Sequence, residues 1–192
     1  MPGMFRINLL LLGVGMAWQL PAQFKYEHEE RMAAEAVPGT ARAVVEMLEL
    51  QGRVRWYREQ GYDRTSIEAK VRHRGQRYSI EFDAGGRLED VEVEVSQRTV
   101  PVVVWKRISA LLTDSLGRYR VQKLQERYTG RPEAVKRHLH GQHSEDVLAG
   151  YELMVSAREE GAYVLFEYEF TADGAFVRRD RVVLHHADHI MY

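Results

Sequence analysis

The sequence of Arg77–Val95, RYSIEFDAGGRLEDVEVEV, predicts a β-hairpin. Before the turn, the apolar residues Tyr78, Ile80 and Phe82 alternate with polar ones, and after it three valines alternate with acidic residues. Every second side chain is therefore apolar, as in a strand that is buried on one face. The two glycines between the runs supply the backbone conformations that a tight turn needs. We expect an antiparallel hairpin with one apolar and one polar face.

The same pattern occurs again near the end of the chain. Ala162–Phe170 alternates in the same way and is followed, after a short turn, by Ala175–Leu184. Both hairpins contain the motif Glu-Phe-x-x-x-Gly, at Glu81–Gly86 and at Glu169–Gly174. Self-similarity of this kind indicates two related structural units.

Each hairpin is preceded by a predicted helix and two further strands. In the first half a helix begins at Val37-Pro38 and ends at Gln51-Gly52, because proline suits the first turn of a helix and glycine its end. In the second half a helix begins at Val100-Pro101 and ends at Gly117. Alternation predicts the strands Arg53–Glu59, Ser66–Arg72, Arg118–Arg127 and Gly150–Arg158. The predicted fold is α+β, with two tandem repeats, residues 23–98 and 99–192, each a helix packed on a four-stranded antiparallel sheet.

Two segments do not fit this pattern. Phe24–Glu35 is highly charged and is either an opening edge strand or a solvated lead-in. Gly130–Asp146 is predicted to be a polar loop, and a loop of this length in a compact domain is either functional or disordered.

The beginning of the chain is typical of an export signal. Arg6 precedes the apolar run Ile7–Trp18, which is too short to span a bilayer, and cleavage is expected after Ala22. Residues 1–22 are thus predicted to be a signal peptide, with an uncleaved membrane anchor as the alternative. The mature protein would be periplasmic or secreted, without a membrane span.

Composition excludes several classes of function. The chain has 192 residues, no cysteine and a formal net charge of −1. It therefore has no disulfide, no thiolate nucleophile and no cysteine-based zinc site, and its charge gives no electrostatic case for binding nucleic acid. No serine-hydrolase elbow and no phosphate-binding glycine loop is present. We expect a protein that is not an enzyme.

Several segments together resemble one family. They are Val37-Pro38, Arg55–Tyr57, Ile67–Lys70, Tyr78–Asp83 with Gly86, Leu88–Glu92, Tyr119 with Lys123–Gln125, and Tyr151–Leu153. The chain resembles the PepSY-like proteins with a β-lactamase-inhibitor-like fold, which are exported by Bacteroidota-type bacteria. The resemblance implies paired helix-plus-sheet units that form a concave surface, and related domains bind or inhibit proteins such as peptidases or β-lactamases. The loop residues on which that inhibition depends do not match here.

Histidines are the concentrated reactive groups of the sequence. One cluster lies in the Gly130–Asp146 loop and one in the C-terminal tail: His138, His140, His143, His185, His186 and His189. Imidazoles at such spacings could share a zinc or copper ion, although none matches a His-Glu-x-x-His helix. The alternative is that these side chains are simply solvated, with no cofactor.

Charged and aromatic strand residues are the candidates for partner binding. Leu88–Val95 carries acidic residues, including Glu92 and Glu94, whereas its counterpart in the second repeat, Ala175–Leu184, carries basic ones, including Arg178 and Arg181. They would either steer a partner or form the solvated side of each sheet, where charge discourages edge pairing. Trp56, Tyr57 and Tyr163 would serve as binding anchors or as core and edge packing.

These observations predict an exported, non-enzymatic protein-binding or inhibitory module with an unidentified protein partner. A metal-binding or metal-sensing envelope protein, using the six histidines, is the alternative from another class. A structural envelope protein without a dedicated ligand is a third.

Overall fold

A computed structural model describes residues 23–61, 64–142 and 144–184. The predicted signal peptide and four of the six candidate metal ligands, His143, His185, His186 and His189, lie outside these ranges.

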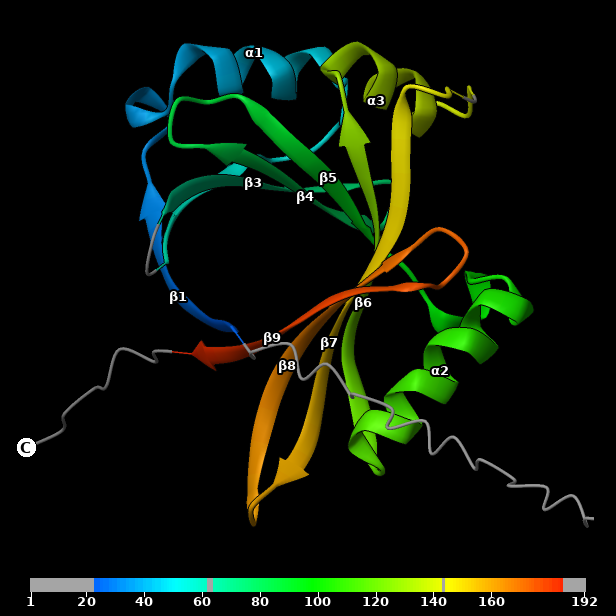
Figure 1. Ribbon diagram of the computed structural model, residues 1–192. Coiled ribbons are helices and arrows are strands. Elements are labelled where there is room, and N and C mark those ends of the chain that lie inside the picture. Colours follow the sequence, from blue (N-terminus) through cyan, green and yellow to red (C-terminus); the bar gives the residue numbers. More distant parts are fainter. Residues whose placement is uncertain (1–22, 62–63, 143, 185–192) are drawn as a thin grey trace, which may run out of the picture.

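Nine strands and three α-helices make up the described part of the chain (Figure 1). The first half contains β1 (Gln23–Met32), α1 (Gly39–Met47), β2 (Arg55–Gln60), β3 (Thr65–His73), β4 (Gln76–Asp83) and β5 (Leu88–Glu94). The second half contains α2 (Val102–Leu116), β6 (Tyr119–Gly130), α3 (Pro132–Leu139), β7 (Val147–Glu159), β8 (Ala162–Thr171) and β9 (Phe176–Leu184).

The nine strands form one closed sheet in chain order. From β1 to β9, each strand pairs antiparallel with the next strand in the chain, and β1 also pairs parallel with β9. This last pairing joins Gln23–Glu27 to Asp180–Leu184, so the two ends of the sheet meet. A closed sheet has an outer and an inner face, and successive side chains of each strand point to opposite faces.

The helices cover the outer face in two places and create two apolar cores. In Figure 1, α1 and α3 lie beside one another over β3, β4 and β5, whereas α2 packs on the other half of the sheet. The first core includes Leu48 from the end of α1, Val135 of α3 and Phe82 of β4. The second core includes Leu112 of α2 and Phe166 of β8. The alternation of apolar residues in the sequence thus marks the outer face of the sheet.

The glycine of each Glu-Phe-x-x-x-Gly motif lies against the start of a helix. Gly86 has φ 85°, and a Cβ placed there would lie 2.4 Å from Thr40 Oγ1 at the beginning of α1. Gly174 has φ 80°, and a Cβ there would lie 3.0 Å from the Val104 carbonyl oxygen in α2. Both positions combine a left-handed backbone with close contact, which only glycine accommodates without strain. The motif is therefore where each hairpin turn packs against its helix.

The structure refines the predicted architecture. Helix α2 ends at Gly117 as predicted, and the predicted strands correspond to β2–β9. The sheet is larger than expected, because β1 joins it and the strands of both halves form a single sheet. Strands β6 and β7 contribute to both cores: Tyr128 and Val147 pack on the first, while Leu124 and Leu153 belong to the second. The division into two tandem repeats at 98/99 remains a prediction.

The structure decides between the two alternatives for one segment and corrects the prediction for another. Phe24–Glu35 is largely strand, because β1 pairs with strands on both sides. The prediction that Gly130–Asp146 is a loop was wrong, because this segment contains α3. Ala134 and Val135 of α3 are buried, and the opposite side of the helix is charged. Its helical period is clear, since Val135 and Leu139 lie one turn apart behind Pro132 in the first turn, but the segment is short and mostly polar.

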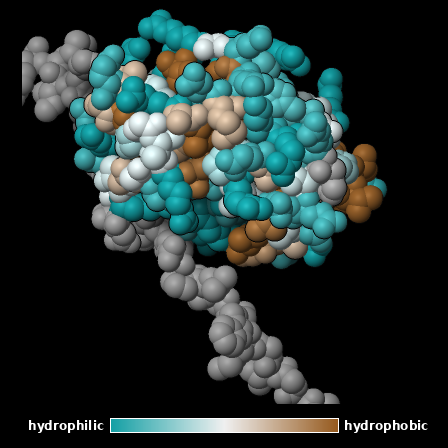
Figure 2. Space-filling model, turned by 90° about the horizontal axis from the view of Figure 1, so that it is seen from above, coloured by the Kyte–Doolittle hydropathy of each residue, from teal (hydrophilic) through white to brown (hydrophobic). Residues whose placement is uncertain are grey.

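The outer surface over α1 and α3 is mostly hydrophilic, with small separate apolar areas (Figure 2). None of the described helices is both long and apolar enough to cross a membrane.

Candidate functional site

Charged residues line the inner face of the sheet, the face turned away from the helices. On β3, Ile67, Ala69 and Val71 belong to the first core, so Glu68, Lys70 and Arg72 point inward. The same alternation places Arg77, Ser79 and Glu81 of β4, Asp90, Glu92 and Glu94 of β5, and Glu167 and Glu169 of β8 on this face. The inner face divides into a basic and an acidic region.

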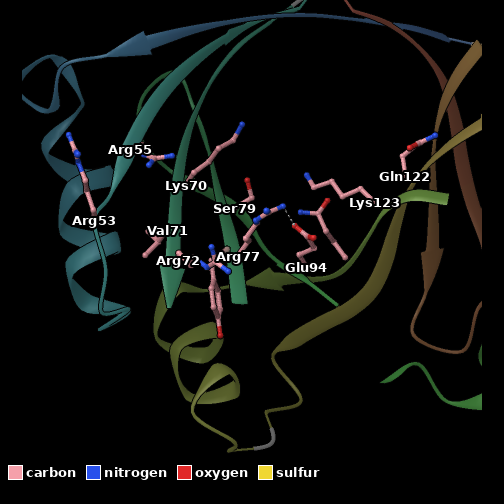
Figure 3. Close-up of a pocket in the computed structure, with 12 residues that line it drawn as sticks. Arg53, Arg55, Lys70, Val71, Arg72, Arg77, Ser79, Glu94, Gln122 and Lys123 are labelled. Atoms are coloured by element: carbon pink, nitrogen blue, oxygen red, sulfur yellow. Dashed lines mark hydrogen bonds and ion pairs between the residues drawn. The ribbon is translucent and has the colours of Figure 1, made fainter. Parts of the chain in front are cut away.

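The basic region surrounds a cleft of about 680 Å³, which we call the cationic cleft. Its volume lies within the range of roughly 300–1,000 Å³ typical of ligand sites. Six of the lining side chains carry positive charge: Arg53, Arg55, Lys70, Arg72, Arg77 and Lys123. Glu94 is the single carboxylate among the described residues that line it. Figure 3 shows these side chains arranged around one open space, contributed by strands from both halves of the sheet.

A second cavity continues the cationic cleft on the side of β1 and β2. It has a volume of about 420 Å³, shares Arg53 and Arg55 with the cleft, and adds Arg31. None of the described residues that line it is acidic. The positive surface is therefore longer than the cleft alone.

Only some of these cations are neutralised within the protein. Arg77 Nη1 lies 3.2 Å from Glu94 Oε2, and Lys70 Nζ lies 3.0 Å from carboxylate oxygens of both Glu29 and Glu68. Arg53, Arg55 and Arg72 are exposed, and no ion pair joins them to another described side chain. These three guanidinium groups are available to a ligand in the cleft.

Lys70 also stays protonated. Burial alone would lower its pKa, but the carboxylates of Glu68 and Glu29 outweigh that effect and raise it above the usual value. Its ammonium lies 4.7 Å from the centre of the Tyr57 ring, a cation–π contact that holds the side chain in place. Lys70 can thus bind an anion but cannot act as a nucleophile near neutral pH.

Glu68 is a buried neighbour of Lys70. It is 4% exposed and accepts a hydrogen bond from the Ser79 hydroxyl. Burial acts to raise its pKa, but the Lys70 ammonium and the Ser79 hydroxyl together lower it below the ordinary value. Glu68 is therefore ionised at neutral pH and fixes the position of Lys70.

The acidic region lies along β4, β5, β7 and β8. Glu92 is 2% exposed and Asp90 is 6% exposed. Burial, followed by the nearby carboxylates of Glu152, Glu81 and Asp90, raises the pKa of Glu92 well above its usual value. Gln125 Nε2 donates a 2.6 Å hydrogen bond to Glu92 Oε2.

Two arginines connect the acidic region across strands. Arg127 Nε lies 2.9 Å from Asp90 Oδ2, and Arg127 Nη1 lies 2.9 Å from Glu169 Oε2. Arg178 pairs with Glu169 and, at 3.0 Å, with Asp180. These pairs hold β5, β6, β8 and β9 together on the inner face.

The predicted partner-binding residues lie in different environments. Trp56 is 6% exposed and contacts Phe82 in the first core, which agrees with core packing, the second of its two expected roles. Tyr57 is half-buried near the cationic cleft, and Tyr163, at the start of β8, is 83% exposed. Arg178 faces inward, whereas Arg181 lies on the outer face and pairs with Glu159 at 3.2 Å.

The expectation that the acidic side chains of β5 are solvated is wrong for Glu92, which is buried. Glu94 is half-exposed and pairs with Arg77. In an open sheet the polar side of a strand faces water, but closure of the sheet through β1 and β9 encloses this face.

Two of the six candidate metal-ligating histidines lie within the described ranges, and the site that the six would share stays a prediction. His138 and His140 lie at the end of α3, where the His138 ring packs 4.7 Å from the Tyr128 ring. His140 Nε2 lies 3.3 Å from the Leu48 carbonyl oxygen. Within the described ranges, every group of three or more potential metal ligands consists of carboxylates alone.

Sequence reasoning missed the cationic cleft. In the sequence, Arg55, Lys70 and Lys123 stand out only as members of the family-like segments, and Arg72 only as the end of a predicted strand. The signal in the sequence is weak, because each cation is one polar position in an ordinary alternating strand. They form a site only when β2, β3, β4 and β6 are placed around one space.

Comparison with known proteins gives a fold and no activity. No protein-family model matches the sequence, and no curated protein matches it at a significant level. Among solved structures, the chain is similar to a DUF2874 family protein from Bacteroides uniformis ATCC 8492, with a TM-score of 0.50 and 14% identity over 76% of this chain and 89% of that one. It is also similar to a protein described as a "putative periplasmic" protein from Bacteroides eggerthii DSM 20697, with a TM-score of 0.51 and 12% identity over 76% and 88%.

A BLIP-like protein from Bacteroides fragilis NCTC 9343 aligns with a TM-score of 0.48 and 14% identity, over 80% of this chain and 92% of that chain. The shared fold rests on the first two structures. The predicted resemblance to Bacteroidota-type proteins is thus supported at the level of the fold, and the link to PepSY-like proteins remains a prediction. The chain has the fold of these two Bacteroides proteins.

Proposed function

We propose that this protein is an exported, non-enzymatic binding module that holds an acidic segment of a partner protein in the cationic cleft. The observation that carries the proposal is the presence of Arg53, Arg55 and Arg72, exposed around one cleft without a carboxylate partner among the described residues. Guanidinium groups pair well with carboxylates, because their planar donors match both carboxylate oxygens.

The distribution of the charges favours a ligand with several separated carboxylates. The cations come from the segment before β2 and from four different strands, and Arg31 extends them into the neighbouring cavity. A single small anion would contact few of them. A polypeptide segment rich in Asp and Glu presents carboxylates at intervals, and its backbone amides can bond to the exposed Gln122 side chain that also lines the cleft.

Nucleic acid fits the cleft less well. Single-stranded nucleic acid is usually held by exposed aromatic rings on which bases stack, in addition to positive charge. Tyr78 is the aromatic residue among the described cleft-lining residues, and it is 9% exposed. The net charge of −1 also gives no overall attraction to a long polyanion.

The titratable groups of the cleft support binding rather than catalysis. Four of the six cations are arginines, which remain protonated in proteins. Lys70 has a raised pKa, so it too carries a fixed charge. Groups that neither gain nor lose a proton near neutral pH suit recognition of an anion.

Fluorescence anisotropy with a labelled eight-residue peptide containing six Asp or Glu residues tests the proposal. The test variant Arg55→Glu/Arg72→Glu reverses two free cations of the cleft. The matched control, Arg98→Glu/Arg118→Glu, makes the same change of net charge at exposed arginines that do not line the cleft. Both proteins are measured at 50 mM and 300 mM NaCl, with a Lys peptide and a heparin fragment as comparison ligands.

The proposal predicts salt-sensitive binding of the acidic peptide, lost by at least about thirtyfold in the cleft variant and changed less than about threefold in the control. Equal loss in both variants would mean general electrostatic attraction and would refute the assigned site. Binding of the heparin fragment with no binding of the peptide would refute the proposed partner class.

A further inference from the structure

The second cavity, of about 420 Å³, lies where β1 and β2 separate. The last residue pair that joins the two strands is Met32 with Trp56, and beyond it β1 ends and β2 has no partner on this side. The cavity is lined by residues 31–34 from the end of β1 and by residues 53–56 around the start of β2. Because both segments are anchored in the sheet, the position of the cavity is fixed.

The charged residues of the second cavity are three exposed arginines, Arg31, Arg53 and Arg55. Met32 packs on the first core, so the preceding Arg31 points to the inner face. Arg53 and Arg55 also line the cationic cleft on that face. All three side chains therefore lie on the side of the sheet away from the helices.

The spacing of these arginines allows all three to contact one ligand. Arg31 pairs with Tyr57 across the strands, which makes Arg55 its diagonal neighbour on the same face. Diagonal neighbours lie roughly 7–8 Å apart, within reach of long side chains. Arg53 is two residues before Arg55, so their Cα atoms are at most about 7 Å apart. Three long cationic side chains thus border a single cavity.

No carboxylate balances these charges among the described residues. None of the described residues that line the cavity is acidic, and the ion pairs of described arginines are made by others, such as Arg77 and Arg127. Glu35 is close in the chain but is not among the lining residues. Like charges on adjacent strands repel one another, and a cavity lined by one sign of charge attracts counter-ions. The cavity therefore favours an anion.

The number of donors indicates an anion with more than two oxygens. Each guanidinium group has five N–H donors in a planar fork that matches two oxygens of a carboxylate or a phosphate. A carboxylate has one charge and two oxygens, so one such group satisfies it. A phosphate monoester carries a charge of about −1.5 to −2 at pH 7 and has three terminal oxygens, so three guanidinium groups can share it. A phosphodiester, as in nucleic acid, carries one charge and fits less well.

We propose that Arg31, Arg53 and Arg55 bind a phosphate group, either free phosphate or the phosphate monoester of a small molecule. In Figure 3, Arg53 and Arg55 lie at one end of the cleft-lining side chains and Gln122 at the other, so the phosphate would lie at one end of the cationic cleft. Among the described lining residues, Arg31 belongs to the second cavity alone and Arg72 to the cleft alone. The site goes beyond the proposed function, because its ligand is a compact dianion rather than a polypeptide.

Calorimetric titration of the full mature chain with sodium phosphate tests the site. The titrations are made at pH 8 and constant ionic strength without peptide, with sodium acetate and glycerol 3-phosphate as comparison ligands. Arg31→Gln is the test variant, and Arg53→Gln replaces it if the first does not fold. Arg98→Gln removes the same charge from an exposed arginine that lines neither cavity, and Arg72→Gln removes it from the cleft alone.

The expected result is one saturable site with a dissociation constant below about 1 mM for phosphate, and binding at least about tenfold weaker for acetate. Arg31→Gln should weaken phosphate binding at least about tenfold, because a charge-assisted pair of hydrogen bonds is lost. Arg98→Gln and Arg72→Gln should each change it less than threefold. Tighter binding of glycerol 3-phosphate would identify the monoester as the ligand, and tighter binding of phosphate would identify the free ion.

Three results would overturn the site: no saturable binding up to 10 mM phosphate, binding no tighter than that of acetate, or equal weakening in Arg31→Gln and Arg98→Gln. Since phosphate is titrated without the peptide, the two proposals fail separately. A chain that binds the acidic peptide but not phosphate would lose this site and keep the proposed function, and the converse result would do the opposite.

Discussion

The two charged regions of the inner face differ in sign and in exposure, although β4, β5 and β6 contribute to both. The cationic cleft has exposed arginines, with Arg53, Arg55 and Arg72 free of described carboxylates. The acidic region is enclosed, with Glu92 2% exposed and its arginines committed to ion pairs. An exposed charge remains available to a partner, whereas an enclosed charge must be balanced from within. The difference separates a surface for recognition from a region that governs stability.

Removal of Arg127 should have the largest effect on stability. It bridges Asp90 and Glu169, which are both buried, so Arg127→Met would leave Asp90 without its cation and Glu169 with Arg178 alone. We expect the free energy of unfolding in urea to fall by about 3–5 kcal/mol. The matched variant in the cleft, Arg77→Met, breaks an exposed ion pair with Glu94 and should cost less than about 1 kcal/mol. Equal losses in the two variants would remove the distinction between the regions.

Glu68→Gln should make stability less dependent on pH in the acid range. The pKa of Glu68 is lowered in the folded protein, so its ionised form stabilises the fold above the unfolded value of 4.5, and this contribution is lost as pH falls through the folded pKa. At pH 7 we expect the variant to lose about 2 kcal/mol, since a hydrogen-bonded charge is removed. Urea unfolding at pH 7 and pH 3 measures the difference. A loss that is the same at both pH values would contradict the assigned ionisation.

Glu92→Gln should raise the stability of the fold slightly, whereas the two preceding variants lower it. Its carboxylate is buried among other acids, so replacing it with a neutral side chain of the same shape removes an unfavourable charge. The amide oxygen can still accept the hydrogen bond from Gln125. In EDTA at pH 7 we expect the free energy of unfolding to rise by about 1 kcal/mol. Glu94→Gln, on the same strand but half-exposed, is the control, and a loss of stability in Glu92→Gln would contradict the account.

Local patterns in the sequence predicted much of the fold. Alternation over Arg77–Val95 located β4 and β5 to within one residue at each end, because the outer face of each strand is consistently apolar. Pro101 and Gly117 marked the two ends of α2, because proline suits the start of a helix and glycine its end. Closure of the sheet depends on pairing between Gln23–Glu27 and Asp180–Leu184, which lie at opposite ends of the chain. No local pattern encodes that contact.

The site was far less predictable than the fold. Glu92 and Glu94 look equivalent in the sequence, yet closure of the sheet buries one and leaves the other beside Arg77. The cations of the cleft, such as Arg55 and Lys123, are distant in sequence and meet only across the inner face. Side chains with the same local pattern therefore acquire different roles from long-range geometry.

Mapping of the bound acidic peptide by NMR tests the central claim most directly. The account predicts that the arginine side-chain Nε–H signals of Arg53, Arg55 and Arg72 shift in proportion to occupancy, while those of Arg127 and Arg178 in the acidic region stay unchanged. Shifts confined to Arg127 and Arg178, or spread evenly over exposed arginines such as Arg98 and Arg118, would contradict the assignment of the cationic cleft as the binding site.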